Sequence, residues 1–312
     1  MAPFDSGNST LNIDPYADNI LIQGLGPILS REEATAFLTY IPRPPADLKG
    51  IPKHVRLHFL LIILDLHLPD VTGVSLQASI DLMLRHGYRY RDPSSSNTWR
   101  AISGIPYVHK TPRAPAMAAA DVGIPGVGKT QAVLRALSYY PQVIRHEKFP
   151  RLENGLNQKV WSSVDVPSSG KAEDLAANLM NRWDRDMANA IPNYTPRFTS
   201  SVARVRRDGI RMLEEWRQVA ISHHLGFLHL DEVQNFFQIS TLERRRKRSN
   251  SDSSLELSIV EDKCLKWILN FTNEWQVPFL GSGTPDGIAA LTKRMSNAQR
   301  ISTGGGSYFS PL

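Results

Sequence analysis

The chain has 312 residues, enough for about two domains, and a hydrophobic fraction of 41% that can supply a buried core. Charged residues at 21% exclude a disordered polyelectrolyte, and the net charge of +6 suits an anionic partner such as nucleic acid without establishing one. The single cysteine, Cys264, excludes an internal disulfide and fits a reducing cytosol.

Residues 1–115 contain many prolines between short helical patterns, and we expect them to form an accessory domain. Its role is either partner binding or only packing on its neighbour. Helices are predicted at Arg31–Tyr40 and Leu76–Arg85, the first with Ser30 and Glu33 as a capping box. The apolar run His58–Leu64 is too short for a membrane helix, which needs about 20 residues, and is predicted to be a buried helix or strand. With no secretory signal at the start, a cytoplasmic protein without a membrane partner is expected.

From residue 116 to residue 312 the pattern alternates between strands and helices. Strands are predicted at Ala118–Val122, Val160–Val166, Phe227–Leu230 and Pro278–Leu280. Helices are predicted at Thr130–Ser138, Ser200–His223 and Ile259–Trp275. Such alternation predicts an α/β fold with a parallel sheet covered on both faces. The basic, serine-rich segment Leu242–Ser254 is predicted to be a mobile insertion.

The clearest motif is GIPGVGKT, which matches the phosphate-binding loop G-x-x-x-x-G-K-[ST] between a strand and a helix. Its glycines let backbone N–H groups surround a phosphate, and the helix N-terminus adds positive potential. Lys129 is expected to reach the β and γ phosphates, and Thr130 to ligate Mg²⁺. The expected nucleotide-binding residues are Gly123, Ile124, Pro125, Gly126, Val127, Gly128, Lys129, Thr130 and Gln131.

A second motif, FLHLDE, places two acidic residues at the end of an apolar strand. Asp231 is expected to hold Mg²⁺, and Glu232 to orient and deprotonate the attacking water. An acidic pair is also common at a helix N-terminus, but its position about 100 residues after the loop favours the catalytic interpretation. The guanine-reading pattern N-K-x-D does not occur, so ATP is favoured over GTP.

Two further segments could complete the site. The strand end FLGSGTP offers Ser282 or Thr284 as a contact to the γ phosphate or the water, although a simple turn is the alternative. Arg294 or Arg300 could act as an arginine finger on a neighbouring subunit, or could lie on a solvated helix face.

Basic residues form two clusters. Arg204, Arg207 and Arg211 repeat at helical spacing, with Arg197 and Thr199 just upstream, and this helix face is the predicted DNA contact. The run Arg244–Arg248 is an alternative DNA contact, but charge runs are usually solvated.

The order of these motifs resembles the TnsC ATPases of Tn-seven-type transposons, which are related to TniB and belong to the AAA+ superfamily. The segments YADNILIQGLGPILS, DLMLRHGYRYRDP, SYYPQVIRHEKF and NAQRISTGGGSYFSPL also look like stretches of such proteins, so the resemblance covers nearly the whole chain. It implies a three-layer αβα P-loop NTPase core with ATP and Mg²⁺ as cofactors. Asp231 and Glu232 then match Walker B, Thr284 matches sensor 1, and Arg300 matches the finger, with Gln299 departing from the usual arginine pair.

The resemblance also implies a function. Its members assemble on duplex DNA as homo-oligomeric rings or filaments in the ATP state. They link a target selector of the TnsD or TniQ type to a transposase of the TnsA and TnsB types. The helical lid and C-terminal tail of relatives are not recognisable, so we expect a truncated bacterial member with weakened hydrolysis. The alternatives are an AAA+ helicase loader or DNA-repair clamp, and a non-hydrolysing ATP-bound DNA scaffold.

Overall fold

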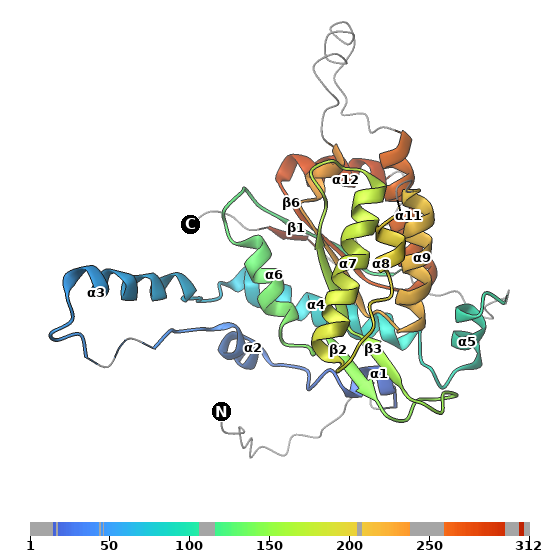
Figure 1. Ribbon diagram of the computed structural model, residues 1–312, viewed down its shortest axis with the longest axis horizontal. Helices are drawn as coiled ribbons and strands as arrows, with labels where there is room; N and C mark the ends of the chain where they lie inside the picture. Colours follow the sequence, from blue (N-terminus) through green and yellow to red (C-terminus); the bar gives the residue numbers. More distant parts are fainter. Residues whose placement is uncertain are drawn as a thin grey trace, which may run out of the picture.

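The computed structural model describes residues 15–16, 18–43, 45, 47–105, 116–204, 208–237, 259–296 and 306–308 (Figure 1). For residues 259–262, 290, 292–296 and 306–308 it describes the backbone alone. The predicted insertion at residues 242–254, including Arg244–Arg248, lies outside the described residues.

The centre of the molecule is a parallel sheet with strand order β4-β5-β6-β1-β7. Its strands are β1 (Ala118–Val122), β4 (Trp161–Asp165), β5 (Phe227–Asp231), β6 (Phe279–Gly283) and β7 (Gly306–Tyr308). The four predicted strands are thereby confirmed to within a few residues at their ends. The antiparallel hairpin of β2 (Val143–His146) and β3 (Leu156–Lys159) was not predicted.

Helices cover both faces of this sheet (Figure 1). The short N-terminal helices are α1 (Ile20–Gln23), α2 (Arg31–Leu38), α3 (Lys53–Leu60) and α5 (Ser96–Ile102). The longer and later ones are α4 (Val71–Arg89), α6 (Lys129–Leu137), α7 (Ala172–Ala190), α8 (Thr199–Val202), α9 (Gly209–Ser222), α11 (Ile259–Trp275) and α12 (Pro285–Ser296). Two 3₁₀ helices, η1 (Leu61–Asp65) and η2 (Val233–Phe237), follow α3 and β5.

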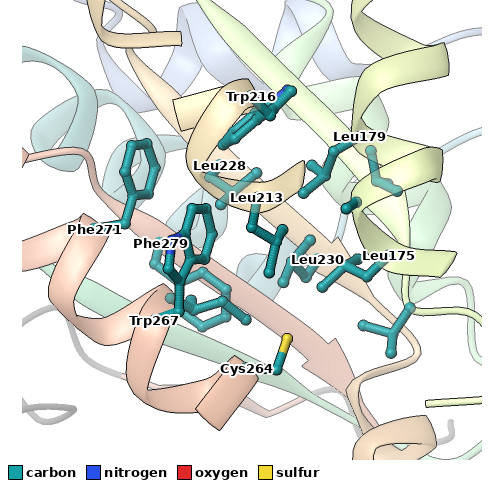
Figure 2. Packing of buried hydrophobic residues seen from close by; sticks show 14 of the residues in the cluster. Leu175, Leu179, Leu213, Trp216, Leu228, Leu230, Cys264, Trp267, Phe271 and Phe279 are labelled. Atoms are coloured by element: carbon teal, nitrogen blue, oxygen red, sulfur yellow. The ribbon is translucent and has the colours of Figure 1, made fainter. Parts of the chain in front are cut away.

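One face of the sheet packs against α7, α9 and α11 (Figure 2). Leu228 and Leu230 of β5 point into this core, where Trp216 of α9 is fully buried. The rings of Trp267 and Phe271 in α11 stack with centroids 5.5 Å apart. Cys264, Trp267 and Phe271 thus lie at helical spacing on the buried face of α11, and the helix spans the predicted residues.

The opposite face packs against α1, α4 and α6. Ala119, Phe227 and Leu280 face this second core because alternate residues of a strand point to opposite sides of the sheet. Leu84 of α4 and Val133 of α6 are fully buried against them. The N-terminal region therefore supplies part of the layer that covers the sheet.

The predicted capping box is confirmed at α2. The Ser30 side chain accepts a hydrogen bond from the Glu33 amide at 3.2 Å, and the Glu33 carboxylate accepts from the Ser30 amide at 2.7 Å. The helix ends at Leu38, two residues earlier than predicted. By contrast, the pattern at Leu76–Arg85 is only the middle of the 19-residue helix α4.

The prediction of one continuous helix over Ser200–His223 is wrong. The short α8 ends at Val202, and α9 begins at Gly209 with Asp208 as its N-cap. The Asp208 carboxylate accepts hydrogen bonds from the amides of Ile210 and Arg211 at 3.1 and 3.2 Å. Such a cap satisfies the free N–H groups of a helix start, so a new helix begins here.

The prediction that His58–Leu64 is buried is also wrong. None of the residues in α3 or η1 is buried, and Leu60 and Leu64 are 64% and 77% exposed. The helix projects from the body as an arm (Figure 1, left), and within the described part of the chain these side chains stay largely exposed. We call residues 40–71 the apolar arm. No helix in the described residues is long and apolar enough to span a bilayer.

Candidate nucleotide-binding site

The phosphate-binding loop joins β1 to α6, as its motif predicts. Gly126 and Gly128 have φ angles of 85° and 88°, which L side chains rarely adopt. A Cβ atom added at either glycine would meet nothing within 4 Å, so the loop borders open space. Helix α6 begins at Lys129, and its free N–H groups face the loop.

The Lys129 side chain folds back onto the phosphate-binding loop. Its ammonium group donates hydrogen bonds to the carbonyl oxygens of Gly123 at 2.7 Å and Ile124 at 2.9 Å. The side chain is 9% exposed. No carboxylate of the described residues lies within ion-pair distance of this buried ammonium, which is therefore available to an anion that enters the loop.

Thr130 and Asp231 are 101 positions apart in the sequence, but their side chains lie in contact. The Thr130 hydroxyl donates a hydrogen bond to the Asp231 carboxylate, whose second oxygen accepts from the Glu232 amide at 2.8 Å. A hydroxyl and a carboxylate are the hard oxygen ligands that Mg²⁺ prefers. In the described part of the chain no three His, Cys, Asp or Glu side chains converge on one point, so phosphate and water oxygens would complete the coordination.

Glu232 follows Asp231 in a left-handed conformation with a φ angle of 56°, and its side chain is exposed. The side-chain Nε2 atom of Gln234 donates a hydrogen bond to the Glu232 carboxylate. The side-chain oxygen of the same Gln234 accepts from the Thr284 backbone amide at 3.2 Å. Gln234 therefore links the predicted base to the end of β6, a contact that sequence reasoning missed because it assigned Gln234 no role.

The two hydroxyl residues proposed at the end of β6 differ in their exposure to solvent. Ser282 is completely buried and hydrogen-bonded to His229 at 2.8 Å, so it is not free to contact a phosphate. Thr284 lies just beyond the strand and is partly exposed, and its hydroxyl accepts a weak bond from the Gly287 amide at 3.4 Å. Of the two residues, Thr284 is the one with exposed surface.

Asp165 is a second residue that sequence reasoning missed. It ends β4 and pairs in register with Asp231 of β5, so two carboxylates meet at this edge of the sheet. Desolvation by burial, together with the Asp231 charge, raises the pKa of Asp165. The available signal was an acidic residue near the end of the apolar segment Val160–Val166. Asp165 is the last residue of β4, as Asp231 is of β5.

The described basic residues of the predicted DNA contact do not lie on one helix. Arg197 and Arg211 are exposed, Thr199 begins α8, and Arg204 lies after that helix and 4.0 Å from the Glu215 carboxylate. Because Arg204 follows α8 and Arg211 belongs to the separate helix α9, these two described arginines do not share one helix face. Arg207 and Arg300 lie outside the described residues, and of Arg294 only the backbone in α12 is described.

A parallel sheet between two helical layers, with a glycine loop leading from β1 into α6, defines an α/β P-loop NTPase fold. The family described as an AAA domain matches residues 116–290, which is more than half of the 312-residue chain. The chain therefore belongs to the AAA domain family, and nucleotide-dependent activity follows from that membership. A search of curated proteins finds no match.

Proposed function

We propose that the protein hydrolyses ATP and uses the ATP-bound state to assemble on duplex DNA as a regulator of transposition. The observation that carries the ATPase part is the convergence of Lys129, Thr130 and Asp231 at the carboxyl end of the sheet. Ligands of open α/β sheets bind at this edge, and the loop glycines leave room for phosphates there.

Each residue has a chemical task in this proposal. Lys129 leaves the two loop carbonyls and pairs with the β and γ phosphates. Thr130 and Asp231 would hold Mg²⁺, which supplies positive charge to neutralise the phosphates. Glu232 accepts a proton from the attacking water, and Gln234 and Thr284 orient that water and the base.

The DNA and transposition parts rest on the resemblance to TnsC and TniB proteins and on the net charge of +6. Arg197, Arg204 and Arg211 are the described arginines proposed to contact DNA phosphates, and Arg207 is proposed with them. Arg294 or Arg300 would complete the site of a neighbouring subunit in a ring or filament. A TnsD- or TniQ-type selector and a TnsA and TnsB transposase are the proposed partners.

The decisive experiment measures phosphate release and DNA-bound assembly for the parent and for Glu232→Gln. The parent should release phosphate, and the variant should do so about 10²–10⁴-fold more slowly while binding ATP and DNA equally well, because glutamine keeps the shape but not the basicity. Glu153→Gln, a change in an exposed carboxylate of the loop before β3, is the matched control. Equal rates for parent and Glu232→Gln would remove Glu232 from the mechanism.

A non-hydrolysing scaffold is the second candidate. One observation favours it: the Glu232 side chain is exposed and already hydrogen-bonded to Gln234. A scaffold would assemble on DNA with ATP yet release no phosphate, and the Glu232→Gln change would have no effect on its lifetime on DNA. The same assay therefore separates the two functions.

A further inference from the structure

Four polar side chains cross the sheet beneath the phosphate-binding loop. They come from four neighbouring strands and are at most 8% exposed: Ser163 of β4, His229 of β5, Ser282 of β6 and Asp121 of β1. The Ser163 hydroxyl lies 2.8 Å from His229 Nδ1, and His229 Nε2 lies 2.8 Å from the Ser282 hydroxyl. The Ser282 hydroxyl in turn lies 3.4 Å from the Asp121 carboxylate. We call these four residues the polar chain.

The polar chain spans two levels of the same face of the sheet. Ser163 pairs in register with His229, and His229 pairs with Leu280, a residue of the apolar core. Two residues later along the strands, Asp165 pairs with Asp231 and Ser282 pairs with Asp121. The polar chain therefore leads from the apolar core to the level of the acidic residues at the nucleotide site.

The hydrogen bonds of the polar chain have a direction set by Asp121. An ionised carboxylate only accepts, so the Ser282 hydroxyl donates to it. Ser282 must then accept from His229 Nε2–H, and His229 Nδ1 must accept from Ser163. With Nε2 donating and Nδ1 accepting, the His229 ring is the neutral Nε2–H tautomer.

Asp121 also faces the nucleotide site. It lies two residues before Gly123, whose carbonyl oxygen accepts a hydrogen bond from the Lys129 ammonium. Its Oδ1 atom is buried and has no hydrogen-bond partner among the described residues. Desolvation raises the pKa of Asp121 to about 7; the Ser282 hydroxyl and the Lys129 ammonium of α6 act in the opposite direction, while Asp231 of β5 raises it further.

We propose that Asp121, held by Ser282 and His229, is a positioning residue that retains the Lys129 ammonium at the base of the loop. The proposal rests on ATP binding at this loop, as proposed above. An ionised Asp121 attracts Lys129 and repels phosphate, whereas a bound nucleotide requires Lys129 for itself. Loss of the Asp121 charge should therefore strengthen ATP binding, which a merely structural role would not do.

The test compares the ATP dissociation constants of three variants at pH 8. Asp121→Asn removes the charge with little change in shape and should bind ATP about tenfold more tightly than the parent. Ser282→Ala removes the hydrogen bond that favours the ionised carboxylate, so it should act in the same direction. The double variant should equal Asp121→Asn, because both changes act through one charge.

Ser162→Ala is the matched control. Ser162 is equally buried on the same strand as Ser163, but it faces the other side of the sheet, and its hydroxyl has no hydrogen-bond partner in the described structure. It should leave ATP affinity unchanged. If Ser162→Ala alters ATP affinity as much as Ser282→Ala, the effect is general loosening of the sheet and the proposal is wrong.

Two further readouts address the charge itself. The ratio of parent to Asp121→Asn dissociation constants should approach one at pH 6, where Asp121 is largely protonated, and titration of ATP cancels in this ratio. Nitrogen NMR of the nucleotide-free parent at pH 8 should show His229 as the Nε2–H tautomer, assigned with His229→Gln. An Nδ1–H tautomer or a pH-independent ratio would overturn the proposal, whereas a parent that binds no ATP would instead contradict the proposed function.

Discussion

Lys129 is the residue on which the nucleotide site most depends. Its ammonium is the one part of the phosphate-binding motif that carries a full positive charge, and it is buried against the loop. We expect Lys129→Ala to weaken ATP binding at least about 100-fold, since a charge-assisted contact of this kind contributes about 2–3 kcal/mol or more. Calorimetric titration measures the affinity. Lys171→Ala, a change in an exposed side chain, should not alter it.

Asp121 makes the stability of the protein depend on pH. Burial raises its pKa to about 7 from the ordinary value of 3.8. For a group whose folded-state pKa is raised, the stabilisation is fully present below the unfolded pKa and is lost as pH rises through the folded pKa.

We expect the difference in free energy of unfolding between the parent and Asp121→Asn to change with pH. From about pH 4 to pH 7 the parent should lose free energy of unfolding relative to this variant, which has no charge at the position. Urea denaturation at several pH values measures this difference. A constant difference across that interval would show that Asp121 is not neutralised by burial.

At the scale of elements, the apolar arm and α4 differ in what their leucines contribute. Leu84 of α4 is fully buried between the helix and the sheet, whereas Leu64 of the arm is 77% exposed. We therefore expect Leu84→Ala to lower the free energy of unfolding by about 2–5 kcal/mol. Leu64→Ala should change it by less than about 0.5 kcal/mol. Chemical denaturation of both variants compares the same substitution in two environments.

Helix α9 stabilises the core through Trp216. The fully buried indole packs against Trp183 of α7 at 6.4 Å and Phe271 of α11 at 5.6 Å between ring centroids, so it joins three helices. Trp216→Ala should cost about 3–5 kcal/mol of stability. Gln218→Ala, at an exposed position of the same helix, should cost less than about 0.5 kcal/mol. Similar losses from both would contradict the packing argument.

At the scale of the whole molecule, the net charge of +6 bears on the proposed DNA contact. Arginines that contact phosphates read no bases, so affinity should be similar for unrelated duplexes and should fall with salt by about 0.9 logarithmic units per phosphate neutralised. Replacing Arg197 and Arg211 by alanine should flatten that slope. Arg204 is the weaker candidate because Glu215 lies nearby.

The measurement is DNA affinity against salt on two duplexes, with and without ATP. ATP should be required, because an assembly multiplies the few contacts that one subunit offers. Arg100→Ala, in the N-terminal helix α5, is a control on general loss of charge. A slope that the double substitution leaves unchanged would place the DNA-facing surface elsewhere.

The sequence by itself determined the features whose causes are local. The phosphate-binding loop could be predicted because Gly126 and Gly128 adopt backbone angles that favour glycine within one short segment. Neighbouring residues likewise predicted the end of β5 at Asp231, the end of β6 before Thr284 and the capping box at Ser30. The parallel sheet followed from the alternation of strands and helices.

Only the tertiary structure decided what depends on residues distant in the chain. The polar chain and the pairing of Asp165 with Asp231 arise because strand order places β4, β5, β6 and β1 side by side. The exposure of the apolar arm could not be predicted from the sequence either. Hydrophobic side chains favour burial, but they are buried only where another segment packs against them. A local pattern sets which backbone a segment prefers, whereas contacts between segments are set by how the whole chain packs.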